Sequence, residues 1–226
     1  MCGRFFRKQK QGYAGDLDGL GDVLRQLAVQ GDQTNIAPSS SIWAIGRKAG
    51  GSLGLSPLRW GLIPYWWRDA AMPGKSFNAR LEEAADKPMW RRAVTRGRCL
   101  IPASGWIEWQ PDDKRKQPWQ ITLPGGEGMM FAGLYDRWVS AEGETPVFSA
   151  AICTTSALPV LADLHPRMPV VLKPEAWGAW LDPANDIRSL AGSVVSLYER
   201  EAVERGVNRV EESADLFSAA PRRSAS

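Results

Sequence analysis

The stretch that decides the fold is residues 98–110, which reads Arg98-Cys99-Leu100-Ile101-Pro102-Ala103-Ser104-Gly105-Trp106-Ile107-Glu108-Trp109-Gln110. Its two apolar runs, residues 98–101 and 105–110, have the length and composition of short β-strands. In the second run successive side chains point to opposite faces, so Trp106 and Glu108 share one face while Ile107 and Trp109 share the other. We therefore expect a strand that carries one carboxylate among aromatic rings.

The segments on either side extend this pattern through most of the chain. We expect further strands at residues 41–46, 119–123, 129–134, 147–154, 168–172 and 193–198, and an apolar, turn-rich stretch at 53–64. Helical spacing of apolar residues predicts helices at 16–29, 87–95 and 174–181, and the end of another at 160–164. Many strands with few helices predict a single α+β domain, with a barrel-like, largely antiparallel β core and peripheral helices.

The amino-acid composition limits the kinds of domain and of metal or disulfide site that this chain can form. The 226 residues carry a net charge of +3, with 44% hydrophobic and 23% charged residues, which suits one globular domain with a sizeable core. We expect that domain to span residues 1–217, followed by a disordered Ala/Ser/Arg-rich tail at 218–226. One histidine and three widely spaced cysteines argue against a structural zinc site and a disulfide framework, so we expect no metal and no cofactor.

The sequence shows no pattern typical of a secretory signal or of a membrane-spanning segment. Basic residues near the N-terminus are not followed by an apolar segment, and no apolar run approaches the ~18 residues of a membrane span. Sparse cysteines also fit a reducing compartment. We expect a monomer in the cytoplasm, or in a nucleoid within it.

Cys2 is the first candidate nucleophile. If Met1 is removed, Cys2 carries both an α-amine and a thiol, with reference pKa values of ~7.7–8.0 and ~8.5. A 1,2-aminothiol condenses with an aldehyde to a five-membered thiazolidine, and an N-terminal cysteine can also serve a hydrolase. The alternative is an ordinary residue after the initiator. Burial of Phe5 and Phe6 would anchor this end of the chain.

Two further side chains are candidates for proton transfer. His165 is the only histidine, and it lies in a stiff Pro-flanked turn. Glu108 lies between tryptophans, where partial desolvation would raise the pKa of its carboxyl towards neutrality. The alternatives are a structural histidine and an exposed strand charge.

Polar and aromatic residues also indicate a nucleic-acid partner. Asn78 can both donate and accept hydrogen bonds, with a helix N-cap as the alternative, and Arg80 could fork onto a phosphate. Seven of the eleven tryptophans lie between Trp60 and Trp119, interleaved with arginines, as in proteins that stack unpaired bases and follow the phosphate backbone. We expect Trp60 and Trp106 in the core, with the Trp66-Trp67 pair as the better candidate for stacking.

Several segments together resemble the SRAP (SOS response-associated peptidase) family. They occur in the family's order and span most of the chain: residues 1–5 (Met-Cys-Gly-Arg-Phe), 35–38 (Asn-Ile-Ala-Pro), 59–64 (Arg-Trp-Gly-Leu-Ile-Pro), 78–82 (Asn-Ala-Arg-x-Glu), 98–109, 131–134 (Phe-Ala-Gly-Leu) and 154–169, which ends in His-Pro-Arg-Met-Pro. The resemblance implies a protein that crosslinks to abasic sites in single-stranded DNA, including sites at junctions with double-stranded DNA. It also implies autopeptidase activity, chiefly removal of Met1, and lyase activity.

Carried over to this sequence, the resemblance assigns roles to individual residues. Cys2 would be the nucleophile, Asn78 would hold the N-terminal region and the sugar, Glu108 would act in Met1 removal and proton transfer, and His165 would be the acid/base partner. The DNA contacts would be Arg4, Asn35, Pro38, Trp66, Trp67, Arg80, Trp109 and Arg167.

Two other functions remain open from the residues alone. One is a Cys/His peptidase that acts on other proteins through Cys2 and His165. The other is a passive single-strand binder without covalent chemistry.

Overall fold

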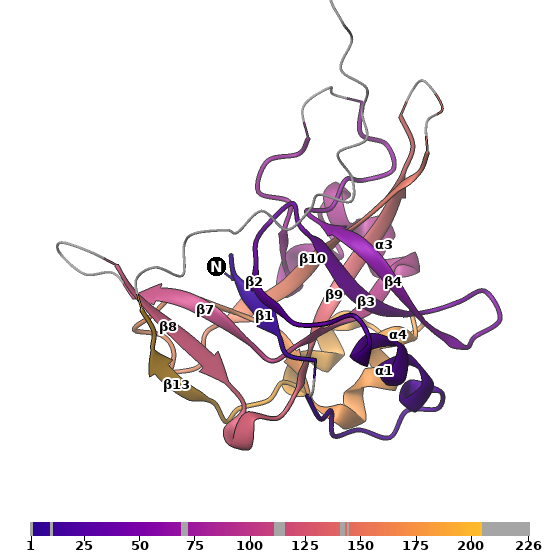
Figure 1. Ribbon diagram of the computed structural model, residues 1–226. Coiled ribbons are helices and arrows are strands. Elements are labelled where there is room, and N and C mark those ends of the chain that lie inside the picture. Colours follow the sequence, from indigo (N-terminus) through magenta and orange to yellow (C-terminus); the bar gives the residue numbers. More distant parts are fainter. Residues whose placement is uncertain are drawn as a thin grey trace, which may run out of the picture.

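The computed structural model describes residues 2–9, 11–68, 72–110, 116–140, 143 and 145–204. The predicted tail at 218–226 and the predicted domain end at residue 217 lie outside these residues. The β-structure falls into two sheets, one of which closes on itself (Figure 1).

The closed sheet is a barrel of five strands, each paired with the next around the ring: β3 (Ser41–Arg47), β4 (Leu53–Trp60), β10 (Val147–Ser156), β9 (Met129–Trp138) and β6 (Arg98–Ala103). The β4–β10 pairing is parallel and the other four are antiparallel. Three short strands extend it: β5 (Asn78–Arg80), β11 (Arg167–Pro169) and β12 (Val171–Leu172).

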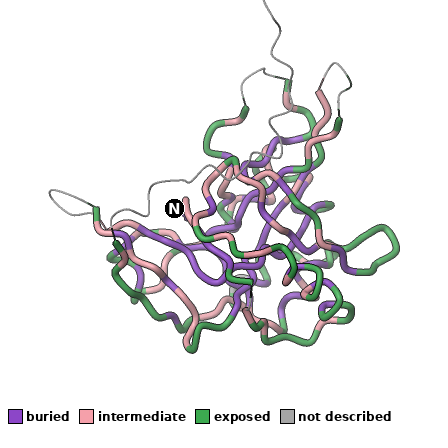
Figure 2. The backbone as a smooth tube through the Cα atoms, in the orientation of Figure 1, coloured by how far each residue is buried: buried purple, intermediate pink, exposed green. Residues whose placement is uncertain are grey.

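Alternation of side chains along these strands builds two cores. Inward residues such as Ile42, Trp60 and Phe131 fill one cluster, and outward residues such as Ile45 and Leu100 join the helices in the other. The helical segments are α1 (Leu20–Ala28), α2 (Leu81–Ala84), α3 (Pro88–Arg96) and α4 (Trp177–Leu181), with short 3-10 turns η1 (Pro124–Gly126), η2 (Pro174–Ala176) and η3 (Ile187–Gly192). Figure 2 shows the barrel strands largely buried.

The second sheet contains the N-terminal strand and packs against the barrel. Its order is β13 (Glu199–Ala202), β8 (Gln117–Thr122), β7 (Gly105–Gln110), β1 (Phe5–Arg7) and β2 (Gln33–Ile36). The Phe5 ring lies 5.1 Å from Trp60 and 5.7 Å from Phe131, edge to face, and therefore locks this sheet onto the barrel interior.

Residues 98–110 connect the two sheets. β6 belongs to the barrel and β7 to the second sheet, and Ser104 alone separates them. The backbone N–H of Ser104 donates to Phe6 O at 2.8 Å, and its hydroxyl accepts from Lys8 N at 2.8 Å. The point at which the chain passes from the barrel to the second sheet is therefore hydrogen-bonded to the N-terminal segment.

The structure confirms the α+β class with a largely antiparallel, barrel-like core, and it corrects several local predictions. Residues 53–60 form β4 because they pair along all of β3, although turn-formers interrupt their sequence. Residues 193–198 form no strand; Val194 makes one isolated bridge to Leu172, and the strand follows at Glu199–Ala202. Residues 160–164 form turns rather than a helix end.

Candidate active site

Cys2 lies inside the molecule. β1 pairs on both sides, with Phe5 opposite Ile36 of β2 and opposite Trp106 of β7, and this pairing anchors the N-terminal segment. The Cys2 side chain is 0% exposed. Asn78 Nδ2 donates a hydrogen bond to Cys2 O at 2.8 Å, which connects the segment to the barrel.

Asn78 does not cap a helix. It begins β5, where it pairs with Ile152 of β10, and α2 starts after Arg80 as its N-cap residue. The N-cap alternative was wrong because the preceding strand pairing holds Asn78 extended and turns its amide towards Cys2.

The thiol of Cys2 is less acidic than the reference value suggested. Burial raises its pKa well above the ordinary range, and the Glu108 carboxylate nearby raises it further. Cys2 in this setting is a neutral thiol, so a base has to accept its proton when it reacts.

Glu108 is a suitable base by position and by proton affinity. It lies on β7, is 6% exposed, and burial raises the pKa of its carboxyl to about 7. It lines a small cavity together with His165, and the other residues of the lining are Trp106, Ile121, Leu161, Leu164, Arg167 and Met168. The structure thus brings together the two proton-transfer candidates, which are 57 positions apart in the chain (165 minus 108).

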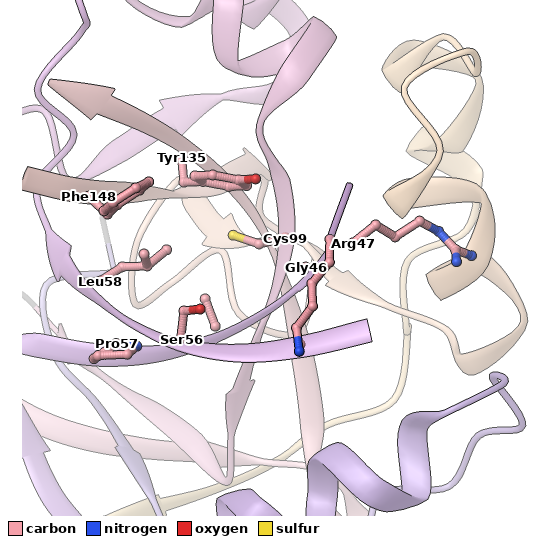
Figure 3. A pocket seen from close by; sticks show the side chains of 11 residues that line it. Gly46, Arg47, Ser56, Pro57, Leu58, Cys99, Tyr135 and Phe148 are labelled. Carbon is pink, nitrogen blue, oxygen red and sulfur yellow. The ribbon is translucent and has the colours of Figure 1, made fainter. Parts of the chain in front are cut away.

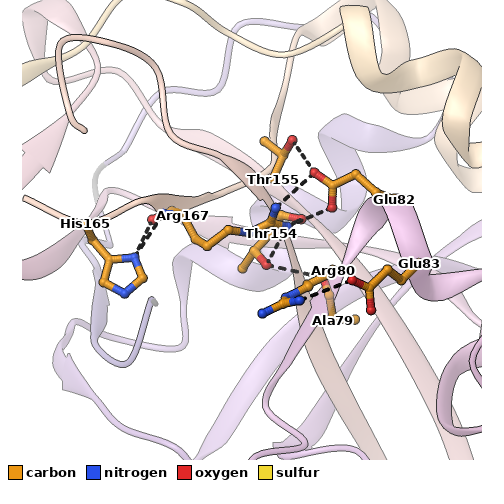
Figure 4. Close-up of polar contacts among 8 residues, drawn as sticks. All are labelled: Ala79, Arg80, Glu82, Glu83, Thr154, Thr155, His165 and Arg167. Carbon is orange, nitrogen blue, oxygen red and sulfur yellow. Dashed lines mark hydrogen bonds and ion pairs between the residues drawn. The ribbon is translucent and has the colours of Figure 1, made fainter.

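The His165 ring is held by the backbone of Arg167. Arg167 N donates to Nδ1 at 3.0 Å, and Arg167 O lies 3.1 Å from the same atom (Figure 4). Burial, together with nearby positive charge including that of Arg167, lowers the pKa of His165 below 6.5. The lowered pKa favours the uncharged ring at neutral pH, and we assign its proton to Nε2 from the hydrogen bond that Arg167 N donates to Nδ1.

Two of the three arginines predicted to contact DNA, Arg80 and Arg167, already have acidic partners. Arg167 forms a two-pronged ion pair with Glu82, at 3.1 and 2.8 Å, and also donates to Thr154 O at 2.6 Å (Figure 4). Arg80 pairs with Glu83 at 3.1 Å. A phosphate at either guanidinium would have to compete with a carboxylate.

Arg4 keeps spare hydrogen-bonding capacity. In the described part of the chain, its buried Nη1 and the buried Nε of Arg167 have no hydrogen-bond partner. Buried N–H groups of this kind are costly unless a ligand or water satisfies them, so both are suited to an anion.

The tryptophans divide as predicted between core and surface. Trp60 and Trp106 are 0% and 1% exposed, whereas Trp66 is 39% exposed and lies beside Trp67 with ring centroids 5.9 Å apart. Trp109 is half-buried, and strand alternation puts it on the opposite face of β7 from Glu108. Asn35 and Pro38 are half-buried on or just after β2, next to β1.

Sequence reasoning missed a groove beside Asn78. This cavity of about 350 Å³ is lined by Asn78, Arg80, and three residues not singled out above, Lys75, Lys87 and Trp90, together with Gly74, Ser76, Glu83, Pro88 and Met89. In the sequence, Trp90 is one of eleven tryptophans, and neither Lys75 nor Lys87 lies in a motif that indicates a binding site. Chain folding alone brings a ring and two ammonium groups to the predicted site.

Two other classes of site are absent from the described residues. No group of three or more His, Cys, Asp or Glu side chains in them is arranged to hold a metal ion. Within the same residues, every helix is too short or too polar to cross a membrane.

With fold and site in place, comparison with known proteins defines the family. Residues 1–210 match the family described as SOS response associated peptidase (SRAP), and the chain belongs to it. It is 38% identical over 213 residues to the "Abasic site processing protein YoqW" of Bacillus subtilis (strain 168), with 90% of each chain covered. It is 31% identical over 189 residues to the "Abasic site processing protein YedK" of Escherichia coli (strain K12), covering 80% of this chain and 79% of that protein.

Solved structures agree on the fold. A protein from Bacteroides thetaiotaomicron superimposes with a TM-score of 0.71 at 22% identity, covering 96% of this chain and 100% of that one. A phage-related protein from Bordetella bronchiseptica gives 0.67 at 28% identity, covering 90% and 95%.

Proposed function

We propose that this protein processes abasic sites, and that it does so by linking Cys2 covalently to the ring-opened sugar in single-stranded DNA. One observation carries the proposal: Asn78 holds the Cys2 carbonyl at 2.8 Å while Glu108, whose charge acts on the Cys2 thiol, shares a cavity with His165. Relatives named as abasic site processing proteins support the choice of substrate. The domain that performs this chemistry spans residues 1–217.

The covalent chemistry begins once hydrolysis of the Met1–Cys2 bond has freed the α-amine. That amine attacks the sugar aldehyde to form a carbinolamine, which loses water to give an imine. The Cys2 sulfur then adds to the imine carbon while its proton leaves, and the ring nitrogen gains a proton. Overall, aldehyde and aminothiol become thiazolidine and one water. With the aldehyde trapped, strand cleavage by β-elimination is prevented.

Proton transfers in these steps fall to Glu108 and His165. A carboxyl with a pKa of about 7 is present in both protonation states near neutrality, so Glu108 can accept the thiol proton and protonate the departing hydroxyl. His165 offers its Nε2 proton because Arg167 N already occupies Nδ1. Asn78 positions Cys2, and such positioning makes the condensation effectively intramolecular.

The DNA strand is assigned to the basic and aromatic surface around this site. Arg4 and Arg167 each have a buried N–H available for a phosphate, and the groove at Lys75, Lys87 and Trp90 extends from Asn78. The exposed Trp66 provides a stacking surface. An abasic nucleotide has no base to unstack, which favours its entry over that of an intact nucleotide.

The central experiment uses a single-stranded oligonucleotide with one abasic site and separates products on a denaturing gel. Wild-type protein is expected to give a shifted band that persists without reduction. The Cys2→Ser variant retains the amine and lacks the thiol, so its product should be an imine that survives only after borohydride. Cys99→Ala, which removes a buried thiol of the barrel, is the matched control and should crosslink like wild type.

Three results would contradict the proposal. A stable crosslink in Cys2→Ala would remove Cys2 from the reaction. Tight binding without any crosslink, in protein shown by mass spectrometry to lack Met1, would indicate a passive binder. Steady turnover of a peptide panel without DNA, dependent on Cys2 and His165, would indicate a peptidase that acts on other proteins.

A further inference from the structure

A further cavity, separate from the two described above, opens at the other end of the barrel. It has a volume of about 440 Å³ and is lined by Ala44, Gly46, Arg47, Lys48, Gly54, Ser56, Pro57, Leu58, Cys99, Tyr135 and Phe148 (Figure 3). These residues come from all five barrel strands, mostly from inward-facing positions. The cavity is therefore the mouth of the barrel.

Strand geometry separates this mouth from Cys2. On β9, Phe131 contacts the Phe5 ring, whereas Tyr135, four residues further along, lines the cavity. On β4, Trp60 contacts Phe5, and Ser56 lines the cavity. Four residues of strand span about 13 Å, so a layer of large buried rings lies between the two sites.

The mouth is hollow because its inward side chains are small. At this end of β3 and β4 the inward-facing residues are Ala44, Gly46, Gly54 and Ser56. At the opposite end, the inward-facing residues of the same two strands include the larger Ile42 and Trp60. A Cβ added to Gly46 would meet its nearest atoms only at 3.8 and 3.9 Å, so the backbone there leaves room for a methyl group. Interiors normally fill such space, and the mouths of β-barrels are common ligand sites.

The walls combine aromatic rings with one cation. Tyr135 pairs with Ala150, two residues after Phe148, so the two rings are diagonal neighbours on the inner face, and Figure 3 shows them on one side of the cavity with Leu58 and Ser56 on the other. The Lys48 stem lies against Gly54 and would collide with a methyl group there. In the part of the chain that the structure describes, Lys48 has no carboxylate partner.

Arg47 does not supply a second cation. Its guanidinium turns away from the cavity in Figure 3 and donates to Gly51 O at 2.8 Å. Cys99 contributes a neutral thiol, since burial raises its pKa well above the ordinary range. The site thus offers an apolar, aromatic interior and a single positive charge at its rim.

We propose that the barrel mouth binds a small aromatic anion, with its ring against Tyr135 and Phe148 and its carboxylate, sulfonate or phosphate at Lys48. The proposed DNA chemistry uses neither these residues nor this cavity, so the two proposals stand or fall separately.

Anilinonaphthalene sulfonate, an aromatic anion with strong fluorescence in apolar sites, is the probe for the test. Wild-type protein should bind it saturably with one-to-one stoichiometry. Gly46→Ile places a branched side chain inside the cavity and should strongly weaken binding, and Ser56→Leu is a second filling variant in case the first does not fold. Gly12→Ile, which adds the same side chain where nothing lies within 4 Å, should bind like wild type. Crosslinking to the abasic oligonucleotide should be unchanged in all three.

Comparison with phenylnaphthylamine, an analogue that lacks the sulfonate, tests the role of the Lys48 charge. Lys48→Gln should weaken binding of the sulfonate about fivefold and leave binding of the uncharged analogue unaffected. Lys48→Arg, which keeps the positive charge, should bind the sulfonate like wild type. Absence of binding, stoichiometry above one, or unchanged binding in both filling variants would overturn the proposal. Displacement of the probe by an intact single-stranded oligonucleotide would also overturn it, because the probe would then occupy the DNA surface.

Discussion

Glu108 shows how much one environment can change one side chain. On an exposed strand its carboxyl would titrate near 4.5, but burial on β7 raises the pKa to about 7. The same burial makes Cys2 a neutral thiol, so the base and the nucleophile are adjusted together. In the reaction we propose, proton transfer between these two neighbours therefore takes the place of a preformed thiolate.

The raised pKa of Glu108 predicts a pH-dependent stability. The folded protein keeps this proton up to about pH 7, whereas the unfolded chain releases it near 4.5, so the free energy of unfolding falls as pH rises through that window. The loss amounts to about 3 kcal/mol. Glu108→Gln should lack it, and urea unfolding at pH 5 and pH 8 measures the difference. Glu127→Gln, at an exposed glutamate, should follow wild type; a parallel pH dependence in Glu108→Gln would contradict the assignment.

The Asn78 amide makes a second prediction at the residue scale. Asn78→Ala removes the donor to Cys2 O, and we expect crosslinking to slow by about 10- to 100-fold because the amine is no longer positioned. Single-turnover rates on the abasic oligonucleotide provide the measurement. Asn185→Ala removes a comparable bond, from Nδ2 to Ala179 O at 3.1 Å, and should keep the wild-type rate. Equal rates in both variants would assign Asn78 no positioning role.

At the scale of elements, short segments meet through charged side chains. The start of α2 carries Glu82, which holds Arg167 of β11, and Arg167 in turn holds the His165 ring through its backbone. Two segments distant in sequence, the start of α2 and residues 165–167, are thus fastened together at one edge of the site. The carboxylate that orders Arg167 also competes with any phosphate there.

This competition predicts that loss of a charge strengthens DNA binding. Glu82→Gln should raise the affinity for single-stranded DNA about fivefold at most, because the ion pair is partly exposed. The slope of log affinity against log salt should steepen by about one, since Arg167 then neutralises a further phosphate. Asp22→Asn removes a charge that pairs with Arg25 on α1 and is the control. Weaker binding by Glu82→Gln would show that Arg167 does not contact the strand.

The Trp66-Trp67 pair makes the other prediction at this scale. Trp66→Ala should reduce the affinity for single-stranded DNA by about 1–3 kcal/mol, the value of one stacked base, with little change in melting temperature. Phe148→Ala is the matched control, because that ring is 42% exposed against 39% for Trp66 and lies at the far mouth of the barrel. Fluorescence anisotropy of a labelled oligonucleotide compares the two. Equal affinities would exclude Trp66 from the strand's path.

For the whole molecule, the decisive feature is how the second sheet joins the barrel. Trp60 fills the barrel beneath Phe5, and its Nε1 donates to Phe77 O at 2.9 Å, immediately before Asn78. One buried ring therefore supports both the N-terminal strand and the strand that carries Asn78. Global stability and site geometry are coupled through it.

Trp60→Ala should consequently destabilise the protein by about 3–5 kcal/mol and slow crosslinking, although Trp60 has no chemical role and no DNA contact in our proposal. Urea unfolding and single-turnover crosslinking at equal folded fraction measure both effects. Trp43→Ala, at a half-buried position of β3, should cost less and leave the crosslinking rate unchanged. A full crosslinking rate in folded Trp60→Ala would show that site and core are independent.

Local patterns were sufficient for most of the fold. The strands predicted at residues 98–101 and 105–110 and the helix predicted at 87–95 correspond to β6, β7 and α3, within one or two residues at each end. Their apolar patterns are properties of a few consecutive positions. β4 was missed because its identity as a strand depends on its partner β3 rather than on its own turn-rich sequence. The expected strand at 193–198 failed for the converse reason, since only Val194 found a partner.

By itself the sequence determined the kinds of chemistry available: one histidine, a cysteine at position 2, a carboxylate between tryptophans, and arginines interleaved with aromatic residues. Only the tertiary structure decided their states. Whether Cys2 is buried, whether Glu108 holds a proton at pH 7, and which carboxylate occupies Arg167 depend on groups that are far apart in the chain. Desolvation and Coulomb interactions act through space, and the distances in space are set by the closed barrel and the sheet packed against it.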